Sequence, residues 1–342
     1  MRLRIIHVLL ALAVFGLVPV FCRAAVTDAA AKCDADYGDP PRMAPSLLSL
    51  DGDVGLLLNL FNDCLFNGGS VLDWIDARHE RRRACLFVPP QASPQVPLPL
   101  VVFLQGSLIP APPQLLLTDW IPQSTTADLS GDPQRPGFIL LVPIGRNTTH
   151  IYPFPDNAGL GWDNWYRNLD RGSPDLNPDV AAIDHFIAAV ESRGIVDGDR
   201  VYMAGWSNGA AMAQLYALNT PSVAAAAVYS SPDPFSDILD PCAQKPFAST
   251  MTPLMEVHNA CDISGICQTG MRFHQELAQL FPTLPQSVTT LDAVGKPVLA
   301  CVASCASQAY AGPGRAYHVL WPLGWNDAIF QWLREHPLNA KP

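Results

Sequence analysis

Short apolar runs alternate along the chain with segments whose apolar residues recur at helical spacing. A run of strand length that is apolar at every position indicates a strand covered on both faces, as in a parallel sheet. Leu100–Leu104 is the clearest such run, and Ala84–Val88 is interpreted as an edge strand. The predicted strands are residues 84–88, 100–104, 138–142, 200–204, 224–229, 253–257 and 298–302.

Helical patterns lie between these strands. Residues 179–193 have branched apolar side chains at helical spacing and are followed by Gly194, which favours a helix end. Further helices are predicted at residues 208–218, 271–280 and 326–335. Because strands and helices alternate, the chain is predicted to form an α/β domain around a mostly parallel sheet with right-handed crossovers.

One turn in this pattern carries a chemical signature. Gly205-Trp206-Ser207-Asn208-Gly209 lies between a predicted strand and an alanine-rich predicted helix. A sharp strand-to-helix turn tolerates a serine only if the residues two before and two after it lack side chains, and it lifts the hydroxyl above the sheet. Ser207 is therefore a candidate nucleophile. The alternative is an ordinary serine in a tight turn.

A serine hydroxyl needs a histidine to take its proton and a carboxylate to hold that histidine. If the order along the chain is serine, acid, histidine, the candidates for the base are His274, His318 and His336. His274 and His336 fall on predicted helices and are expected at the surface. His318 is predicted in a loop just before the terminal helix, where the base belongs.

The best candidate for the acid is Asp262, which follows the predicted strand 253–257. Active groups gather at the carboxyl ends of parallel strands. Asp233 and Asp237, after the preceding predicted strand, remain rivals.

An acyl-transfer site also needs donors for the oxyanion, each typically lowering the barrier by about 3 kcal/mol. The backbone N–H of Asn208, at a helix N-terminus, is one candidate. The backbone N–H of Ser107 is the other, because Gly106 before it permits close approach to a substrate. The alternative is that Gly106 only forms a turn.

These motifs together resemble the secreted α/β-hydrolase esterases that include polyhydroxybutyrate depolymerases and feruloyl or acetylxylan esterases. The resemblance spans residues 83–336 and rests on residues 100–106, 201–213, Asp262 and His318 followed by Trp321-Pro322. It implies an α/β-hydrolase fold, with a mostly parallel central sheet and helices on both faces. It also implies that Ser207, Asp262 and His318 form the catalytic triad.

The chain departs from the family pattern after the strand 100–104. Gln105 stands where the family usually has histidine, and Ser107 where it usually has cysteine. Backbone donors survive such changes, whereas contacts to the substrate need not.

The long aromatic stretch 145–179 is interpreted as a functional loop. The candidate substrate-binding residues are Trp206, Trp162, Trp165 and Gln105, although a single tryptophan is more often part of a core.

The N-terminus has the layout of a secretory signal peptide. Residues 1–24 contain two arginines, an apolar run from Ile5 to Phe21 and a small-x-small ending, Cys22-Arg23-Ala24. A retained membrane anchor is the alternative, but the run is short for a membrane span. Residues 25–82 are interpreted as an N-terminal appendage and residues 83–342 as the α/β-hydrolase catalytic domain. The protein is expected to be secreted or periplasmic.

The hydropathy and net charge of the chain exclude some classes of protein and partner. The 342 residues are 49% hydrophobic, with a mean hydropathy of +0.14, which excludes a disordered protein. The full chain has 21 basic and 31 acidic residues, which gives a formal charge of −10. Removal of the signal peptide takes away three arginines and no acidic residue, so the formal charge becomes −13. Such a chain is repelled by nucleic acids and anionic lipids, so neither is an expected partner.

Eight cysteines remain without the signal peptide, an even number that favours up to four disulfides in an exported chain. The proposed local pairs are Cys261–Cys267 and Cys301–Cys305. A disulfide involving Cys33 and Cys64 would hold the appendage. A zinc site is the competing interpretation, but the cysteine spacings and the lack of a nearby histidine pair disfavour it.

The leading hypothesis is a secreted serine esterase that acts on a small or oligomeric ester and needs no cofactor and no metal. A serine peptidase of the prolyl-oligopeptidase type shares the fold and the triad order, but the appendage is too small for its gating domain. A non-catalytic binding protein with a hydrolase fold is the third possibility. Such proteins usually lose the serine or the histidine, and this chain has candidates for both.

Overall fold

The computed structural model describes residues 64–107, 111–148, 159–162, 171–172, 174, 177–234, 251–263, 265–302 and 317–339. The predicted signal peptide lies outside these residues, as does most of the predicted appendage. No helix in this described part of the chain is long and apolar enough to cross a membrane.

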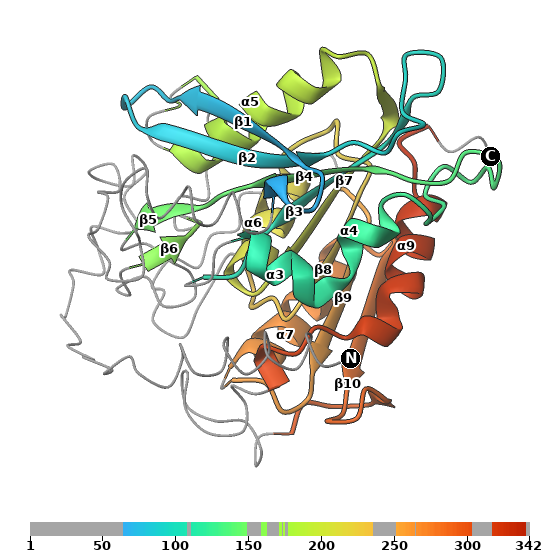
Figure 1. Ribbon diagram of the computed structural model, residues 1–342. Coiled ribbons are helices and arrows are strands. Elements are labelled where there is room, and N and C mark those ends of the chain that lie inside the picture. The colour runs from blue at the N-terminus through green and yellow to red at the C-terminus, as the bar shows by residue number, and fades with distance from the viewer. Residues whose placement is uncertain are drawn as a thin grey trace.

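Within the described residues, a nine-stranded sheet forms the centre of the molecule (Figure 1). Its strands are β1 (Ser70–Ile75), β2 (Arg81–Phe87), β3 (Leu98–Leu104), β4 (Ile139–Pro143), β7 (Val196–Trp206), β8 (Ala225–Tyr229), β9 (Leu254–Asn259), β10 (Gln286–Leu291) and β11 (Pro297–Val298). The strand order is β1-β2-β4-β3-β7-β8-β9-β10-β11. Strands β4 to β10 in this order run parallel, and β1, β2 and β11 are antiparallel to their neighbours. A separate antiparallel pair consists of β5 (Arg146–Thr148) and β6 (Gly159–Gly161).

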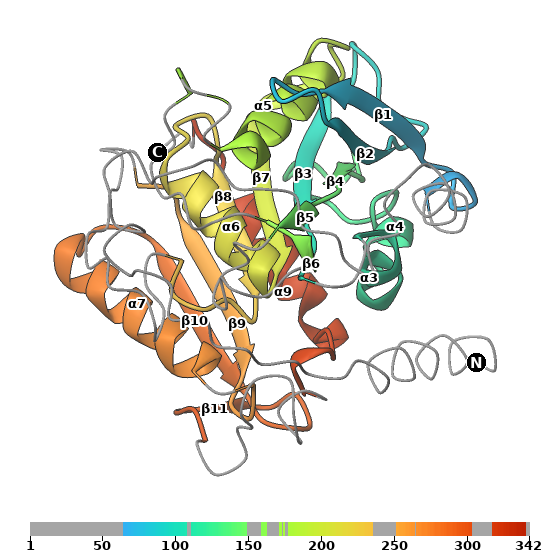
Figure 2. The same ribbon diagram turned by 90° about the vertical axis from the view of Figure 1, so that its left-hand side faces the viewer.

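Helices cover both faces of the sheet. One face carries α5 (Pro178–Glu191), α6 (Asn208–Leu218) and α7 (Ile266–Leu280), which stand in front of the strands in Figure 2. The other face carries α3 (Ala111–Thr118), α4 (Trp120–Gln123) and α9 (Asn326–Glu335), which follows the short 3₁₀ helix η3 (Leu323–Trp325). This arrangement is the α/β-hydrolase architecture that the sequence predicts.

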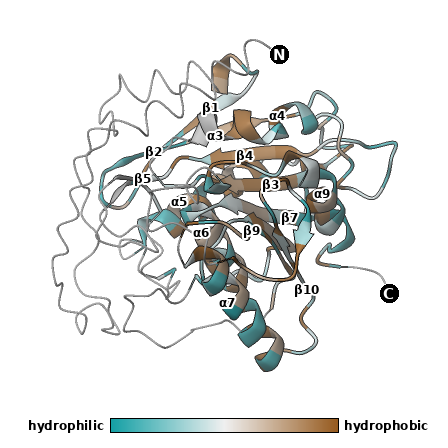
Figure 3. Cartoon of the chain, turned by 90° about the horizontal axis from the view of Figure 1, so that it is seen from below, coloured by the Kyte–Doolittle hydropathy of each residue, from teal (hydrophilic) through white to brown (hydrophobic). Residues whose placement is uncertain are grey.

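The two hydrophobic layers follow from the alternation of side chains along the strands. In β3, Leu100, Val102 and Leu104 belong to the core under α5 and α6, whereas Val101 and Phe103 belong to the core under α4 and α9. All seven residues of β3 are buried, as expected for an apolar strand that is covered on both faces (Figure 3).

The central elements lie where the sequence predicts them, but the edges differ. The predicted edge strand 84–88 corresponds to β2, and the true edge strand is β1, outside it. Strand β10 and the helices α3 and α4 were not predicted. The predicted strand 298–302 is wrong except at Val298, the one residue that it shares with β11. The sequence gives no strand signal for β1 and β10 because β1 and most of β10 are incompletely buried, and they therefore lack a continuous apolar run.

The predicted boundary at residues 82/83 falls inside β2. Arg82 is buried there and forms an ion pair with Asp179 at the start of α5, with 2.6 Å between Nη2 and Oδ1. Arg146 also reaches the same carboxylate, at 3.2 Å. Residues 70–82 are thus joined to the main sheet both by strand pairing and by this buried charge network.

The predicted disulfide pairs are wrong. Cys64 pairs with Cys85, and Cys267 pairs with Cys301. Cys261 is also disulfide-bonded. The hairpin of β10 and β11 returns the chain to the end of β9, where Val302 N–H donates to the Ala260 carbonyl at 2.8 Å. This return brings Cys301 beside Cys267 in the first turn of α7, with 5.9 Å between their Cα atoms.

A buried polar network connects β9 with α7 and β10. The Glu256 carboxylate contacts His258 Nδ1 and His274 Nε2, both at 3.0 Å, and accepts from the Gln214 amide at 2.9 Å. The outer nitrogens of both rings contact side chains of β10. His274 is 4% exposed, so the prediction that it lies at the surface is wrong. Burial opposes ionisation of Glu256, but the bonds from the two histidines outweigh it and lower its pKa to about 2.

Glu256→Gln should destabilise the protein in a pH-dependent way. Because the folded pKa of Glu256 lies below its usual value of 4.5, its contribution is present above pH 4.5 and is lost as the pH falls toward 2. We expect the variant to lose about 3 kcal/mol of unfolding free energy at pH 7 and progressively less below pH 4.5. Urea unfolding from pH 7 to pH 3 measures this difference. The exposed Glu335→Gln is the matched control, and an equal loss at every pH would contradict the role of the Glu256 charge.

Candidate active site

The turn at Ser207 connects the end of β7 to the start of α6. Ser207 has φ 57° and ψ −123°, a conformation that costs a non-glycine residue free energy. Two backbone hydrogen bonds of 3.0 Å fix it, from Ser207 N–H to Tyr229 O and from Ala211 N–H to Ser207 O. The strained turn is therefore held by the sheet on one side and by the helix on the other.

The two glycines of this turn are required by close backbone contacts. A Cβ at Gly205 would lie 2.4 Å from the carbonyl oxygen of Gly209. A Cβ at Gly209 would lie 2.1 Å from the carbonyl oxygen of Gln105 and 2.3 Å from that of Leu104. The start of α6 thus packs directly against the end of β3.

Three predicted residues, distant in sequence, form a hydrogen-bonded chain. His318 Nε2 lies 2.8 Å from Ser207 Oγ, and His318 Nδ1 lies 2.7 Å from Asp262 Oδ1. A carboxylate can only accept, so the ring proton belongs on Nδ1, and Nε2 accepts from the serine hydroxyl. All three side chains are at least nine-tenths buried. This arrangement can transfer a proton from the serine to the imidazole.

The backbone around His318 is held by side chains from two neighbouring strands. Trp206 at the end of β7 donates from Nε1 to the His318 carbonyl at 2.9 Å, and Tyr229 at the end of β8 donates from its hydroxyl to the Tyr317 carbonyl at 3.0 Å. Burial, and then the negative charge of Asp262, raise the pKa of Tyr229 well above its usual value, so its hydroxyl remains a donor. The sheet thus sets the position of the histidine.

Asp262, the predicted acid, is fixed by its own loop and by a residue that the sequence analysis did not identify. Asp262 Oδ1 accepts from the Ile263 N–H at 2.7 Å. Asp262 Oδ2 accepts from the hydroxyl of Ser230, which also lies 2.9 Å from His318 Nδ1. Ser230 directly follows β8, next to the strand that carries Ser207. That position at the carboxyl edge was the signal in the sequence that could have identified it.

The predicted oxyanion donors lie on the two segments that meet at Gly209. Asn208 is the first residue of α6, and its side chain exchanges hydrogen bonds with the backbone N–H and carbonyl of Trp162, at 2.7 and 3.1 Å. Trp162 Nε1 donates to the Gln105 carbonyl at 2.9 Å. Ser107, two residues after Gln105, is half-buried. The segment around Trp162 therefore joins the start of α6 to the loop after β3.

The predicted substrate-binding side chains have little accessible surface. Trp206 is 3% exposed, and Trp162 and Gln105 are both 0% exposed. Each of them also makes a hydrogen bond within the protein, the Gln105 side chain accepting from Gly145 N–H at 3.2 Å. Their contacts within the protein align the surrounding loops. Trp165 lies outside the described residues.

The rival acids and bases within the described residues have other contacts. His274 belongs to the Glu256 network, and the His336 ring contacts the Trp332 carbonyl at 2.8 Å. The Asp233 N–H contacts Thr269 at 3.4 Å, and Asp237 lies outside the described residues. Among the described candidates, the carboxylate that reaches His318 is that of Asp262.

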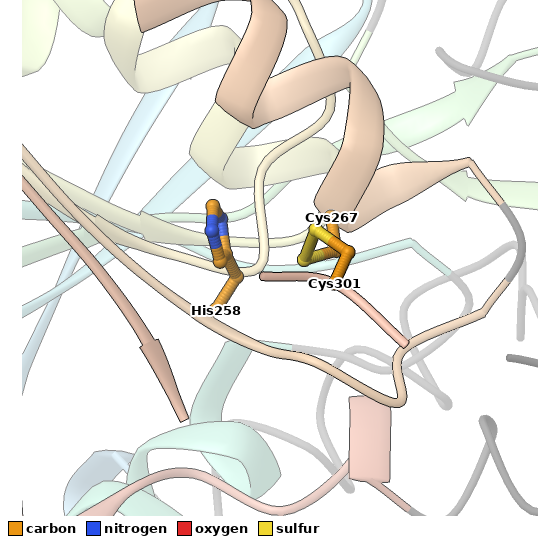
Figure 4. Close-up of side chains that lie close together, drawn as sticks. All are labelled: His258, Cys267 and Cys301. Carbon is orange, nitrogen blue, oxygen red and sulfur yellow. A yellow bond between two sulfur atoms is a disulfide. The ribbon is translucent and has the colours of Figure 1, made fainter. Parts of the chain in front are cut away.

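One group of side chains in the described part of the chain has the residue types of a metal site. Potential ligand atoms of His258, Cys267 and Cys301 lie within 4.8 Å of one another (Figure 4). The two sulfurs are bonded to each other, and the ring nitrogens of His258 contact Glu256 and Thr290. We therefore interpret the group as a structural disulfide beside the buried histidine. The absence of a metal requirement stays a prediction.

The sheet order, the parallel crossovers and the serine at the β7–α6 turn define an α/β-hydrolase. The solved S-formylglutathione hydrolase from Agrobacterium tumefaciens has the same fold, with a TM-score of 0.52, 13% identity and coverage of 79% of this chain and 96% of that chain. Similarity at this identity bears on the fold alone.

Residues 83–239, just under half of the chain, match the family model described as Esterase PHB depolymerase. Over this segment the chain is similar to the esterases that this family model describes. A comparison with the curated proteins gives no significant match.

Two other solved structures are similar at TM-scores below 0.5. Acetyl xylan esterase from Aspergillus awamori is 16% identical over 69% of this chain and 96% of its own, with a TM-score of 0.47. Dipeptidyl peptidase 4 from Porphyromonas gingivalis is 16% identical over 65% of this chain, with a TM-score of 0.39. This chain covers 31% of the length of that peptidase.

Gly209→Ala should be strongly destabilising, because the added methyl would meet two backbone carbonyls that cannot move independently. We expect a loss of about 2 kcal/mol or more of unfolding free energy. Gly198→Ala adds the same methyl where nothing lies within 4 Å, and should change stability by no more than about 0.5 kcal/mol. Chemical denaturation compares the two variants. Equal stabilities would contradict the steric explanation of the turn.

Proposed function

We propose that the protein is a secreted serine esterase in which Ser207, His318 and Asp262 form the catalytic triad. The observation that carries this proposal is the hydrogen-bonded chain from Ser207 Oγ through both nitrogens of His318 to Asp262, with contacts of 2.8 and 2.7 Å. The family match over residues 83–239 supports an ester as the substrate.

In the acylation step, Ser207 Oγ attacks the ester carbonyl while its proton passes to His318 Nε2. The resulting oxyanion accepts from the backbone N–H groups of Asn208 and Ser107. His318 then gives its proton to the leaving alcohol, and the acyl group stays on Ser207. Asp262 holds the Nδ1 proton throughout and stabilises the transient imidazolium.

In the deacylation step, water enters and gives a proton to His318 Nε2 as its oxygen attacks the acyl-enzyme. Collapse of the second tetrahedral intermediate releases the carboxylic acid and returns the proton to Ser207. No cofactor is needed for either step.

For the substrate class we propose a hydroxyalkanoate ester, either small or oligomeric. The description of the matching family supports this choice over a phenolic ester of plant cell walls. The disulfides Cys64–Cys85 and Cys267–Cys301, together with the signal-like residues 1–24, support an oxidising compartment outside the cytosol.

Ser207→Ala should abolish ester hydrolysis without unfolding the protein. We expect kcat to fall by at least about 1,000-fold, because the nucleophile is lost while the fold remains. The measurement is turnover of acyl esters of increasing chain length, a hydroxybutyrate oligomer, methyl ferulate and a prolyl peptide by both proteins. Equal turnover by wild type and variant would exclude the mechanism, and a preference for the prolyl peptide would favour a peptidase.

Labelling with a fluorophosphonate is the second measurement. We expect a covalent adduct on Ser207 in the folded wild type and none in Ser207→Ala. If the folded wild type forms no adduct, a non-catalytic binding protein becomes the better interpretation.

A further inference from the structure

Ser230 occupies an unusual position beside the proposed triad. It is 0% exposed and follows the last residue of β8. Its hydroxyl lies 2.9 Å from His318 Nδ1 and donates to Asp262 Oδ2. One buried hydroxyl therefore contacts both the acid and the base.

The protons in this group can be assigned. Ser230 has a single hydroxyl proton, and the donation to Asp262 Oδ2 uses it. The lone pairs of Ser230 Oγ then remain for the N–H at His318 Nδ1, which points mainly to Asp262 Oδ1 at 2.7 Å. Ser230 thus donates to the second carboxylate oxygen of Asp262 and provides a second acceptor for the proton on His318 Nδ1.

The backbone at Ser230 is held in a costly conformation. Its φ is 59°, a value that a residue with a Cβ seldom adopts outside turns. The Ser230 N–H donates to the Val257 carbonyl at 2.8 Å, so the bend is fixed by the neighbouring strand β9. Among the described residues, Ser207 is the other serine with positive φ. A glycine would fit the backbone better, so the side chain itself calls for an explanation.

We propose that Ser230 is a positioning residue for the hydrolytic reaction, an inference that rests on the proposed triad. It keeps the Asp262 carboxylate in the plane of the His318 ring and holds the Nδ1 proton in place while Nε2 gains and loses the proton of Ser207. Without the hydroxyl, the acid loses its donor at Oδ2 and the ring can turn away from Ser207.

The neighbouring Ser231 provides a matched comparison. It is also 0% exposed, but its hydroxyl donates to the carbonyl of Pro232 at 2.8 Å, within its own segment. Removal of this hydroxyl deletes one buried hydrogen bond of a serine without touching Asp262 or His318. Ser231→Ala therefore controls for the general cost of a lost buried serine hydroxyl.

The test uses Ser230→Ala and Ser230→Gly beside Ser231→Ala and Ser207→Ala. The alanine variant keeps the strained φ with a Cβ, whereas glycine relieves it, so the two differ in stability but both lack the hydroxyl. The sites that can react are titrated with a fluorophosphonate, and kcat is expressed per titrated site. Misfolding lowers the number of titrated sites, whereas poor positioning lowers the rate at each site.

We expect kcat per titrated site to fall by about 10- to 100-fold in both Ser230 variants, as for the loss of a hydrogen bond to a charged group, with KM changed by less than about 2-fold. Ser231→Ala should keep the wild-type kcat per site. Wild-type kcat per site in Ser230→Gly, or an equal loss in Ser231→Ala, would overturn the inference. Either result, with an inactive Ser207→Ala, leaves the proposed function intact. An active Ser207→Ala would instead refute the triad itself.

Discussion

The site depends on the direct backbone contact between the start of α6 and the end of β3. Because residue 209 has no side chain, the helix N-terminus can approach the Gln105 carbonyl, where a Cβ would lie only 2.1 Å from the oxygen. Ser207, two residues earlier, has a positive φ, as the serine of a sharp strand-to-helix turn does. The contact at Gly209 places the two predicted oxyanion donors on segments that touch. A single steric constraint thus relates the proposed nucleophile to the predicted oxyanion donors.

The histidine is positioned by a different means. His318 comes from a segment near the C-terminus, and no strand carries it. Trp206 and Tyr229, the last residues of two adjacent strands, donate to the carbonyls of His318 and Tyr317. Trp321 packs its ring against both aromatic rings, with centroids 5.5 and 5.4 Å away. The parallel register therefore fixes the imidazole through the side chains of Trp206 and Tyr229, of which the sequence analysis assigned Trp206 to substrate binding.

Local sequence predicted those features that depend on local sterics or on continuous burial. The glycines around Ser207 and the apolar runs of β3 and β4 are of this kind, and they led to the fold and the nucleophile turn. Strand β10 escaped prediction because its residues are mostly half-buried and polar. The disulfide between Cys267 and Cys301 escaped it because 34 residues separate the two cysteines, and the return of the β10–β11 hairpin brings them together.

The loop that carries Asp262 shows why such long-range contacts matter for the proposed hydrolysis. Asp262 lies between Cys261 and Cys267, both of which are disulfide-bonded, and its two oxygens accept from Ile263 and Ser230. Each restraint alone leaves the carboxylate free to rotate or the loop free to shift. Together they fix both its position and its plane, as a group must be fixed if it is to orient a histidine. The three motifs of the proposed triad therefore give an incomplete description of the site, since the restraints that align these residues come from residues without a motif of their own.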